Sequence, residues 1–322
     1  MKSLLQVSDL GKTFTSRSMF KKKQFQAVRN VQFSLERGEV LAIVGESGSG
    51  KSTIARMLTN LIPATDGDIY YNGEALRQNR DLRRRLPTFV QMIFQDPFAA
   101  LNPHHTIGYI IGRPMQVQRQ VKGDTRPRVL ELLRKVGLAP AEDFIDKYPY
   151  QLSGGQKQRV VIAKVLGLNP KVIIADEPTS MLDVSIGVDI MNLLLDLKDK
   201  EDLSLILITH NLGSARYMAD RIMVMYAGQV MEYGPAEELI QRPQHPYTKL
   251  LLYSSPDPWR SAEEEPVTDV QREPVSGAGC SFYHRCPSAK DVCRATQVAA
   301  VETESGRSVL CHLYAQGGGE GR

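Results

Sequence analysis

The sequence predicts an α/β fold, in which buried strands alternate with helices and a helical segment is inserted between them. Three short, continuous apolar runs are typical of strands buried on both faces: Val40–Val44, Val172–Ala175 and Leu205–Ile208. From about residue 97 to residue 168, apolar residues recur at helical spacing. This order of elements indicates an α/β domain with a helical insertion.

The N-terminal part begins with two segments in which apolar and polar residues alternate, Leu4–Leu10 and Ala27–Leu35. Such alternation predicts half-buried strands. The buried strand at Val40–Val44 is followed by a Gly-rich turn and then by a helix over about Lys51–Asn60. Asp66-Gly67 is a turn signal after that helix.

The remaining elements continue the alternation. Phe89–Phe94 is expected to form a strand, and Arg126–Val136 a helix with apolar residues at helical spacing. A further helix is expected around Ile186–Lys198, between the last two buried strands.

Composition changes after Tyr253. The following residues are rich in Pro, Ser and acidic side chains, which predicts a linker, and the terminal GGGEGR is expected to be disordered. Otherwise the chain of 322 residues, with 42% hydrophobic and 24% charged residues, is ordinary for a globular protein. We expect one domain over residues 1–253, with a helical subdomain at about 97–168, and a linker with a small tail over 254–322.

The charge balance excludes some classes of protein. A net charge of +4 is too mild to indicate a nucleic-acid partner, which usually draws a concentrated basic face. No apolar run approaches the roughly 18 residues of a membrane span, so a cytoplasmic protein is expected. Basic runs at Lys21–Lys23 and Arg83–Arg85 fit a solvated surface, or a surface facing anionic lipid or acidic partners. The first run is predicted to lie in an exposed loop between the first two strands.

A phosphate-binding motif follows the first buried strand. GESGSGKS matches G-x-x-x-x-G-K-[ST] and lies between a strand and a helix, where its glycines let backbone N–H groups face phosphate oxygens. Lys51 is expected to reach the β- and γ-phosphates, and the Ser52 hydroxyl to ligate Mg²⁺. The expected ATP contacts of this region are Gly45, Glu46, Ser47, Gly48, Ser49, Gly50, Lys51, Ser52 and Thr53.

Two acidic residues close the second buried run, VIIADE. A strand end opens onto the crevice in which α/β sheets bind ligands. Asp176 is therefore expected to help hold Mg²⁺, and Glu177 to act as general base toward the attacking water. Without the phosphate-binding loop, the same pair would suit a solvated acidic turn.

Residues 152–156 read LSGGQ, and with this motif the chain resembles the nucleotide-binding subunits of ATP-binding cassette (ABC) transporters. The resemblance covers residues 4 to about 253 and implies a P-loop NTPase cassette with an N-terminal antiparallel β subdomain and an inserted helical subdomain. It implies that two cassettes pair head to tail. Ser153, Gly154, Gly155 and Gln156 would then contact the nucleotide held by the partner, because a Ser and two glycines at a helix start form an anion cradle.

The same resemblance assigns three further residues. Gln95, in FQDPFAALNP, resembles the glutamine of the Q-loop, which senses Mg²⁺ and the attacking water. His210, in LILITH, resembles the switch histidine at the γ-phosphate, although a lone His is often only structural. Asp183 ends a D-loop that reads SMLD, in which Met181 stands where Ala is common.

The adenine contact is less well defined by the sequence. Phe14, in GKTF, is the candidate aromatic residue for stacking on the base, and Phe20 is its rival. A core aromatic residue would be the alternative reading of Phe14.

The C-terminal part narrows the resemblance. His245-Pro246-Tyr247-Thr248 resembles the segment that closes the cassette in ATPases of the peptide and nickel importer group, which often carry a cysteine tail. The four cysteines of this chain all lie in that tail: Cys280, Cys286, Cys293 and Cys311. Four thiolates suit a 4Fe–4S cluster or a zinc site. We expect the 4Fe–4S cluster, because zinc sites usually contain closer Cys pairs and the peptide-importer group often carries such a tail. Four free thiols remain the third possibility.

The resemblance implies an ATPase that uses ATP and Mg²⁺ to drive an importer, most simply of dipeptides or oligopeptides, with nickel and oligosaccharides still open. The implied partners are a second ATPase subunit, identical or different, two transmembrane permease subunits and an extracytoplasmic substrate-binding protein. This implies a position at the cytoplasmic face of the membrane. Two other classes fit part of the pattern: a soluble ABC ATPase without a transport role, and a redox protein built on a cluster.

Overall fold

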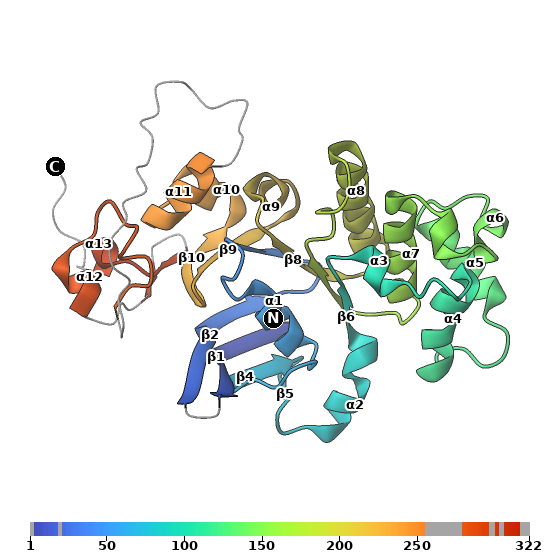
Figure 1. Ribbon diagram of the computed structural model, residues 1–322, viewed down its shortest axis with the longest axis horizontal. Helices are drawn as coiled ribbons and strands as arrows, with labels where there is room; N and C mark the ends of the chain where they lie inside the picture. Colours follow the sequence, from blue (N-terminus) through green and yellow to red (C-terminus); the bar gives the residue numbers. More distant parts are fainter. Residues whose placement is uncertain (1–2, 19–20, 255–278, 296–299, 303–305, 316–322) are drawn as a thin grey trace.

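The computed structural model describes residues 3–18, 21–254, 279–295, 300–302 and 306–315 (Figure 1). Within these ranges the strands form two sheets, a four-stranded sheet in the order β2-β1-β4-β5 and an eight-stranded sheet in the order β11-β12-β10-β9-β3-β8-β7-β6. The strands span β1 Leu5–Ser18, β2 Lys21–Leu35, β3 Val40–Val44, β4 Asp66–Tyr71, β5 Glu74–Ala75, β6 Val90–Ile93, β7 Val172–Asp176, β8 Ser204–Thr209, β9 Arg221–Tyr226, β10 Gln229–Pro235, β11 Val301–Glu302 and β12 Ser308–Val309.

Helices of the described ranges cover the sheets and form the insertion. They span α1 Lys51–Leu58, α2 Arg80–Phe89, α3 Pro97–Ala100, α4 Ile107–Val117, α5 Arg126–Lys135, α6 Glu142–Ile145, the 3₁₀ turn Pro149–Gln151, α7 Gly154–Leu166, α8 Val184–Lys200, α9 Leu212–Met218, α10 Ala236–Gln241, α11 Pro246–Ser254, α12 Asp291–Ala295 and α13 His312–Ala315. No helix among the described residues is both long enough and apolar enough to span a membrane.

The centre of the larger sheet is parallel and buried on both faces. β3 pairs in parallel with β8 and with β9, and every residue of β3 is buried. Alternate residues point to opposite faces of a strand. Leu41 and Ile43 therefore enter the core shared with α1 and the antiparallel sheet, whereas Ala42 enters the core shared with α8 and α9. The continuous apolar runs of the sequence were correctly interpreted as buried strands.

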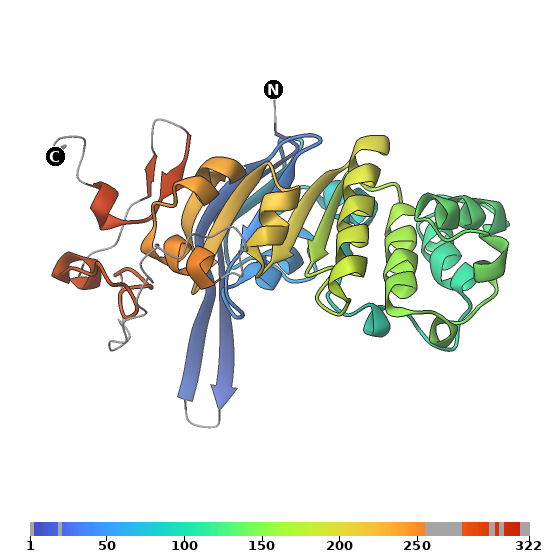
Figure 2. The same cartoon turned by 90° about the horizontal axis from the view of Figure 1, so that it is seen from above.

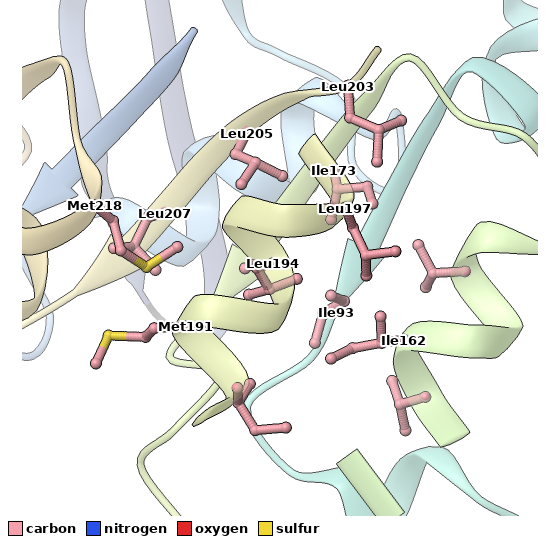
Figure 3. Packing of buried hydrophobic residues seen from close by; sticks show 14 of the residues in the cluster. Ile93, Ile162, Ile173, Met191, Leu194, Leu197, Leu203, Leu205, Leu207 and Met218 are labelled. Carbon is pink, nitrogen blue, oxygen red and sulfur yellow. The ribbon is translucent and has the colours of Figure 1, made fainter. Parts of the chain in front are cut away.

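Helix α8 closes one face of this sheet. Figure 3 shows Leu194 and Leu197 of α8 beside Leu205 of β8 and Ile173 of β7, with Ile162 of α7 on the other side. All five side chains are almost completely buried. This packing fixes the strand ends that carry the candidate catalytic residues.

The helical insertion lies between β6 and β7 in the chain, as expected from the sequence. Its helices α4, α5 and α6 lie with α3 and α7 at the opposite end of the molecule from the described C-terminal residues (Figure 2). α4 and α5 both pack against α7, which carries the LSGGQ motif at its start. The expected helix at Arg126–Val136 is confirmed as α5, Arg126–Lys135.

The first two strands form a longer hairpin than the sequence suggested (Figure 2). Lys21–Lys23 was predicted to lie in a loop, and this is wrong, because the three residues begin β2 and pair with residues 16–18 of β1. Antiparallel strands joined by a short connection continue their ladder toward the turn, and this pairing outweighs the polar composition. The other basic run, Arg83–Arg85, lies exposed on α2.

Asp66-Gly67 was expected to form a turn, but these residues begin β4. The reason is a pairing partner distant in the sequence, since Asp66 lies opposite Gly11 of β1 across a shift in register. Local turn propensity gives way to the ladder formed with β1.

The described C-terminal residues extend the larger sheet. β12 pairs antiparallel with β10 and with β11, so the tail is an integral edge of the cassette sheet. The pairing is anchored by Arg307, whose guanidinium forms an almost fully buried ion pair with Glu232 of β10. The linker was predicted to begin after Tyr253, but Ser254 still belongs to α11, and residues 255–278 and the terminal GGGEGR lie outside the described residues.

Candidate functional site

The phosphate-binding motif forms the loop between β3 and α1 and lies close to other backbone segments. A Cβ on Gly45 would lie 2.1 Å from the Met225 carbonyl oxygen, and a Cβ on Gly50 would lie 2.5 Å from that of Ala27. Gly50 also has φ +102°, in the left-handed region that favours glycine. Glycine is therefore required at both positions by β9 and by β2, which pack against the loop.

Lys51 begins α1 and its side chain is buried under the loop. Its Nζ donates to the carbonyl oxygens of Gly45, at 2.7 Å, and Glu46, at 2.8 Å. Burial lowers the pKa of Lys51, while Glu177, Asp176 and Glu46 oppose that shift. The loop thus concentrates a cation and backbone dipoles where anionic phosphates are expected.

Ser52 and Asp176 meet across the loop. The Ser52 hydroxyl donates to Oδ1 of Asp176 at 3.2 Å, and Asp176 ends β7 with only 7% of its surface exposed. Burial raises the pKa of Asp176, and the neighbouring Glu177 carboxylate raises it further. A hydroxyl and a buried carboxylate are the hard oxygen donors that Mg²⁺ prefers, so the pair fits a magnesium ion.

Glu177 is held by residues from two neighbouring strand ends. Gln95 Nε2, just beyond β6, donates to Glu177 Oε2 at 2.9 Å, and His210 Nδ1, just beyond β8, lies 3.1 Å from Oε1. The backbone N–H of Glu177 donates to the Ile208 carbonyl at 2.8 Å. Glu177 has φ +47°, an uncommon conformation for a residue other than glycine, and such residues cluster at functional sites.

These residues line one cleft of about 780 Å³. Its walls include Phe14, Phe25, Ala27, Gly45, Glu46, Ser47, Gly48, Gly50, Lys51, Ser52, Thr53, Gln95, Glu177, His210 and Leu251. Of the other expected loop and strand-end contacts, Ser49 and Asp176 are buried behind this wall. The structure thus brings nearly all the predicted phosphate-side residues together.

Two aromatic rings stand at the open side of the cleft. Phe14 of β1 and Phe25 of β2 are cross-strand partners, and both are strongly exposed. The sequence pointed to Phe14 but missed Phe25, which follows only from the pairing register of the hairpin. The rival Phe20 lies outside the described residues.

The LSGGQ residues do not line this cleft. Ser153 caps α7, because its Oγ accepts from the Gln156 N–H while the Gln156 side chain accepts from the Ser153 N–H at 3.0 Å. A Cβ on Gly155 would lie 2.7 Å from Ile186 of α8, whereas Gly154 begins the helix with more room. The start of α7 is therefore packed against α8 and contributes no wall to the cleft at the chain's own phosphate loop.

Asp183 lies at the N-terminus of α8 and lines a second cavity, of about 200 Å³. Glu177 and His210 line both this cavity and the cleft. Asp183 thus shares the second cavity with Glu177, the candidate base, but does not line the phosphate-side cleft.

All four cysteines of the tail line one small cavity, together with His245 and His312. Each is a free thiol, and burial raises the pKa of Cys280 to about 11. The cavity measures about 20 Å³, roughly the room that one water needs. No three His, Cys, Asp or Glu side chains among the described residues are arranged to hold a metal ion. The four thiols thus lie around one cavity, but in this structure they are not arranged as metal ligands.

Two family models match the chain. Residues 28–180 match the model described as ABC transporter, and residues 231–293 match the model described as oligopeptide/dipeptide transporter, C-terminal region. Among curated proteins, the dipeptide transport ATP-binding protein DppF of Haemophilus influenzae is 40% identical over 90% of this chain and 90% of its own length. The oligopeptide transport ATP-binding protein AppF of Bacillus subtilis is 41% identical over 97% of this chain and 98% of its own length.

Solved structures agree with the fold. The dimeric post-hydrolysis state of the ATP-binding cassette MJ0796 with ADP and Pi is 30% identical, covers 72% of this chain and 98% of its own, and superposes with a TM-score of 0.63. The cbiO1 protein of Clostridium perfringens, part of the cbiONQ ABC transporter complex, is 29% identical, covers 75% and 92%, and gives a TM-score of 0.65.

Proposed function

Because the chain belongs to the ATP-binding subunits of oligopeptide and dipeptide ABC transporters, we propose that it hydrolyses ATP in its cleft to drive peptide import. The observation that carries the proposal is the Glu177 carboxylate, held by Gln95 and His210 at the mouth of a phosphate-binding loop.

The phosphate-side residues divide into two tasks. The loop from Gly45 to Thr53 binds the phosphates through backbone N–H groups, with Lys51 neutralising their charge. Ser52, Asp176 and Gln95 would hold Mg²⁺, and a bound magnesium ion would supply positive charge to neutralise the phosphates. The contact between Ser52 and Asp176 and the burial of Asp176 support this assignment.

Glu177 acts as general base toward the attacking water. A carboxylate only accepts hydrogen bonds, so Gln95 and His210 donate to it and orient it. Proton abstraction by a positioned carboxylate contributes about 10²- to 10⁴-fold to a rate. His210 and Gln95 also stand where the γ-phosphate and its metal would enter the cleft.

A second cassette, identical or homologous, completes the nucleotide-binding site. Ser153, Gly154, Gly155 and Gln156 contact the nucleotide bound by the partner, and Asp183 lies at the same interface. Support comes from the start of α7, a helix N-terminus whose residues do not line the chain's own cleft. Phe14, with Phe25 beside it, stacks on the adenine.

The membrane partners are two permease subunits, and an extracytoplasmic binding protein delivers the substrate. The ATPase pair then docks at the cytoplasmic face of the membrane. Dipeptides or oligopeptides are the proposed cargo because the similar proteins are named for them. Nickel and oligosaccharides are the alternatives that the cargo experiment must separate.

The function is tested with the complete transporter reconstituted in vesicles. Added dipeptides or oligopeptides, with the binding protein, should stimulate ATP hydrolysis and enter the vesicles, whereas nickel and oligosaccharides should do neither. Stimulation by nickel alone would contradict peptide import but not ATPase activity. ATP hydrolysis that no membrane subunit influences would favour a soluble ATPase.

For the tail, we propose that Cys280, Cys286, Cys293 and Cys311 ligate a 4Fe–4S cluster with a structural role. Support comes from their convergence on one cavity, which has to widen on loading. Anaerobic purification should give about four irons per chain and absorbance near 400 nm, both lost in Cys286→Ser. Zinc without iron, or four titratable thiols without metal, would contradict the cluster.

A further inference from the structure

Glu46 of the phosphate-binding loop is held from two sides by the C-terminal part of the chain. Its backbone N–H donates to the Tyr247 hydroxyl of α11 at 3.0 Å. Its side-chain oxygens both lie 2.9 Å from Nη1 of Arg285, a residue distant from the loop in sequence. The loop is thus tied to a segment outside the ATP-binding motifs.

Arg285 is itself placed by a buried aromatic cluster. Phe282, fully buried, packs edge-on against Tyr226, with 5.2 Å between ring centroids, and its ring is tilted against that of Tyr247 at 5.3 Å. The Arg285 guanidinium lies 5.8 Å from the Tyr226 and Phe282 rings, and His284 Nε2 is 3.1 Å from the Tyr226 hydroxyl. Arg285 therefore reaches Glu46 only when this segment is docked.

The Glu46 main chain transmits that contact to the phosphate site. Its carbonyl accepts from Lys51 Nζ at 2.8 Å and from the Ser49 N–H at 3.2 Å. A shift of Glu46 would move the lysine and the backbone N–H groups expected to face the phosphates. Glu46 is therefore a junction between the tail and the phosphate-binding loop.

We propose that Arg285 is a positioning residue for nucleotide binding: through Glu46 it fixes the first half of the phosphate-binding loop. This inference rests on the proposed ATPase function. It makes docking of the cysteine-bearing segment a requirement for full nucleotide affinity.

A simpler electrostatic role for the pair predicts the opposite result for one variant. If Glu46 acted only as a negative charge near anionic phosphates, Glu46→Gln would remove repulsion and tighten binding. If Glu46 acts as the anchor that Arg285 grips, Glu46→Gln loosens the loop and weakens binding. The sign of the change in affinity therefore separates the two.

The test measures the dissociation constant of MgATP for the purified full-length chain and its variants. Arg285→Ala and Glu46→Gln should each weaken binding about three- to tenfold, the size expected for one partly exposed, charge-assisted contact. The double variant should be no weaker than either single one, because both remove the same contact. Arg285→Lys should recover only part of the affinity, since an ammonium lacks the planar fork of the guanidinium.

Arg294→Ala is the matched control, because Arg294 is an exposed arginine on α12 in the same segment. It should bind MgATP as the unmodified chain does. Thermal unfolding of each variant reports whether the fold is retained, and Arg285→Lys keeps the test open if Arg285→Ala unfolds.

Unchanged affinity in Arg285→Ala, tighter binding in Glu46→Gln, or multiplying effects in the double variant would each overturn the inference. Failure of the unmodified chain to bind MgATP would instead overturn the proposed function. The two failures are therefore distinguishable in one experiment.

Discussion

The Glu177 carboxylate accepts a hydrogen bond from Gln95 at 2.9 Å, although the two residues follow different strands of the parallel sheet. β6 and β7 are neighbours, so their carboxyl ends meet at the same edge. The contact places an amide donor on the residue best suited to act as general base.

His210 should be required for turnover but not for folding. It is strongly exposed and touches the opposite carboxylate oxygen of Glu177, at 3.1 Å. We expect His210→Ala to lower kcat of the assembled transporter about 10²-fold or more, because the base loses its orienting partner. His104→Ala, at an exposed position in the insertion, should keep full activity. Equal activities of the two variants would remove His210 from the mechanism.

When no cation is bound, the buried Asp176 carboxylate should lower the stability of the folded chain. Burial raises the pKa of Asp176 in the folded chain above its value in the unfolded chain. The protonated group therefore stabilises the fold below the unfolded pKa, and this stabilisation is lost as the pH rises through the folded pKa. At neutral pH, Asp176→Asn should therefore raise the Tm of the nucleotide-free chain by about 2 °C.

The same variant should abolish the extra Tm gain that Mg²⁺ gives in the presence of ATP. The paired comparison is ATP with Mg²⁺ against ATP with a chelator. A variant that keeps the full magnesium effect would show that Asp176 is not a ligand.

Arg307 should hold the tail to the sheet. It pairs with Glu232, whose side chain is fully buried and also accepts from the backbone N–H of Gln244 and His245. Arg307→Met should lower the free energy of unfolding by about 3 kcal/mol, because a buried carboxylate loses its cation. Adding Glu232→Gln should restore part of that loss in urea unfolding, and an additive double variant would contradict the pairing.

Phe14 should recognise the base and not the phosphates. Phe14→Ala should weaken binding of ATP at least about fivefold, in line with the 1–3 kcal/mol that aromatic stacking on a base contributes. Binding of inorganic triphosphate should not change. Phe25→Ala provides the comparison across the hairpin, and equal weakening for both ligands would assign the aromatic residues to loop packing.

The local parts of this fold could be predicted from sequence. The run VLAIV followed by GESGSGKS specifies strand, loop and helix within a few residues, so β3 and α1 form where expected. Glu177 and His210 were each predicted at a strand end. Their contact then follows from the parallel order of β7 and β8.

Features that depend on distant partners could not be predicted. Asp66 begins a strand because Gly11 lies opposite it, and Arg307 enters the core because it pairs there with the buried Glu232 carboxylate. The apolar run RIMVMY is a strand signal for β9, although no strand was predicted there from the sequence. The contact between Arg285 and Glu46 has no sequence pattern at all, because it arises from docking of the tail.

The role of Glu177 as general base is tested most directly by ATP turnover of the reconstituted transporter with Glu177→Gln in this subunit. The glutamine keeps the size and hydrogen-bonding reach of the side chain but cannot take a proton. We expect MgATP binding to be retained and turnover at this site to fall at least about 10²-fold. Glu237→Gln, an exposed glutamate on α10, should leave turnover unchanged. Full turnover in Glu177→Gln would contradict the assignment of the base.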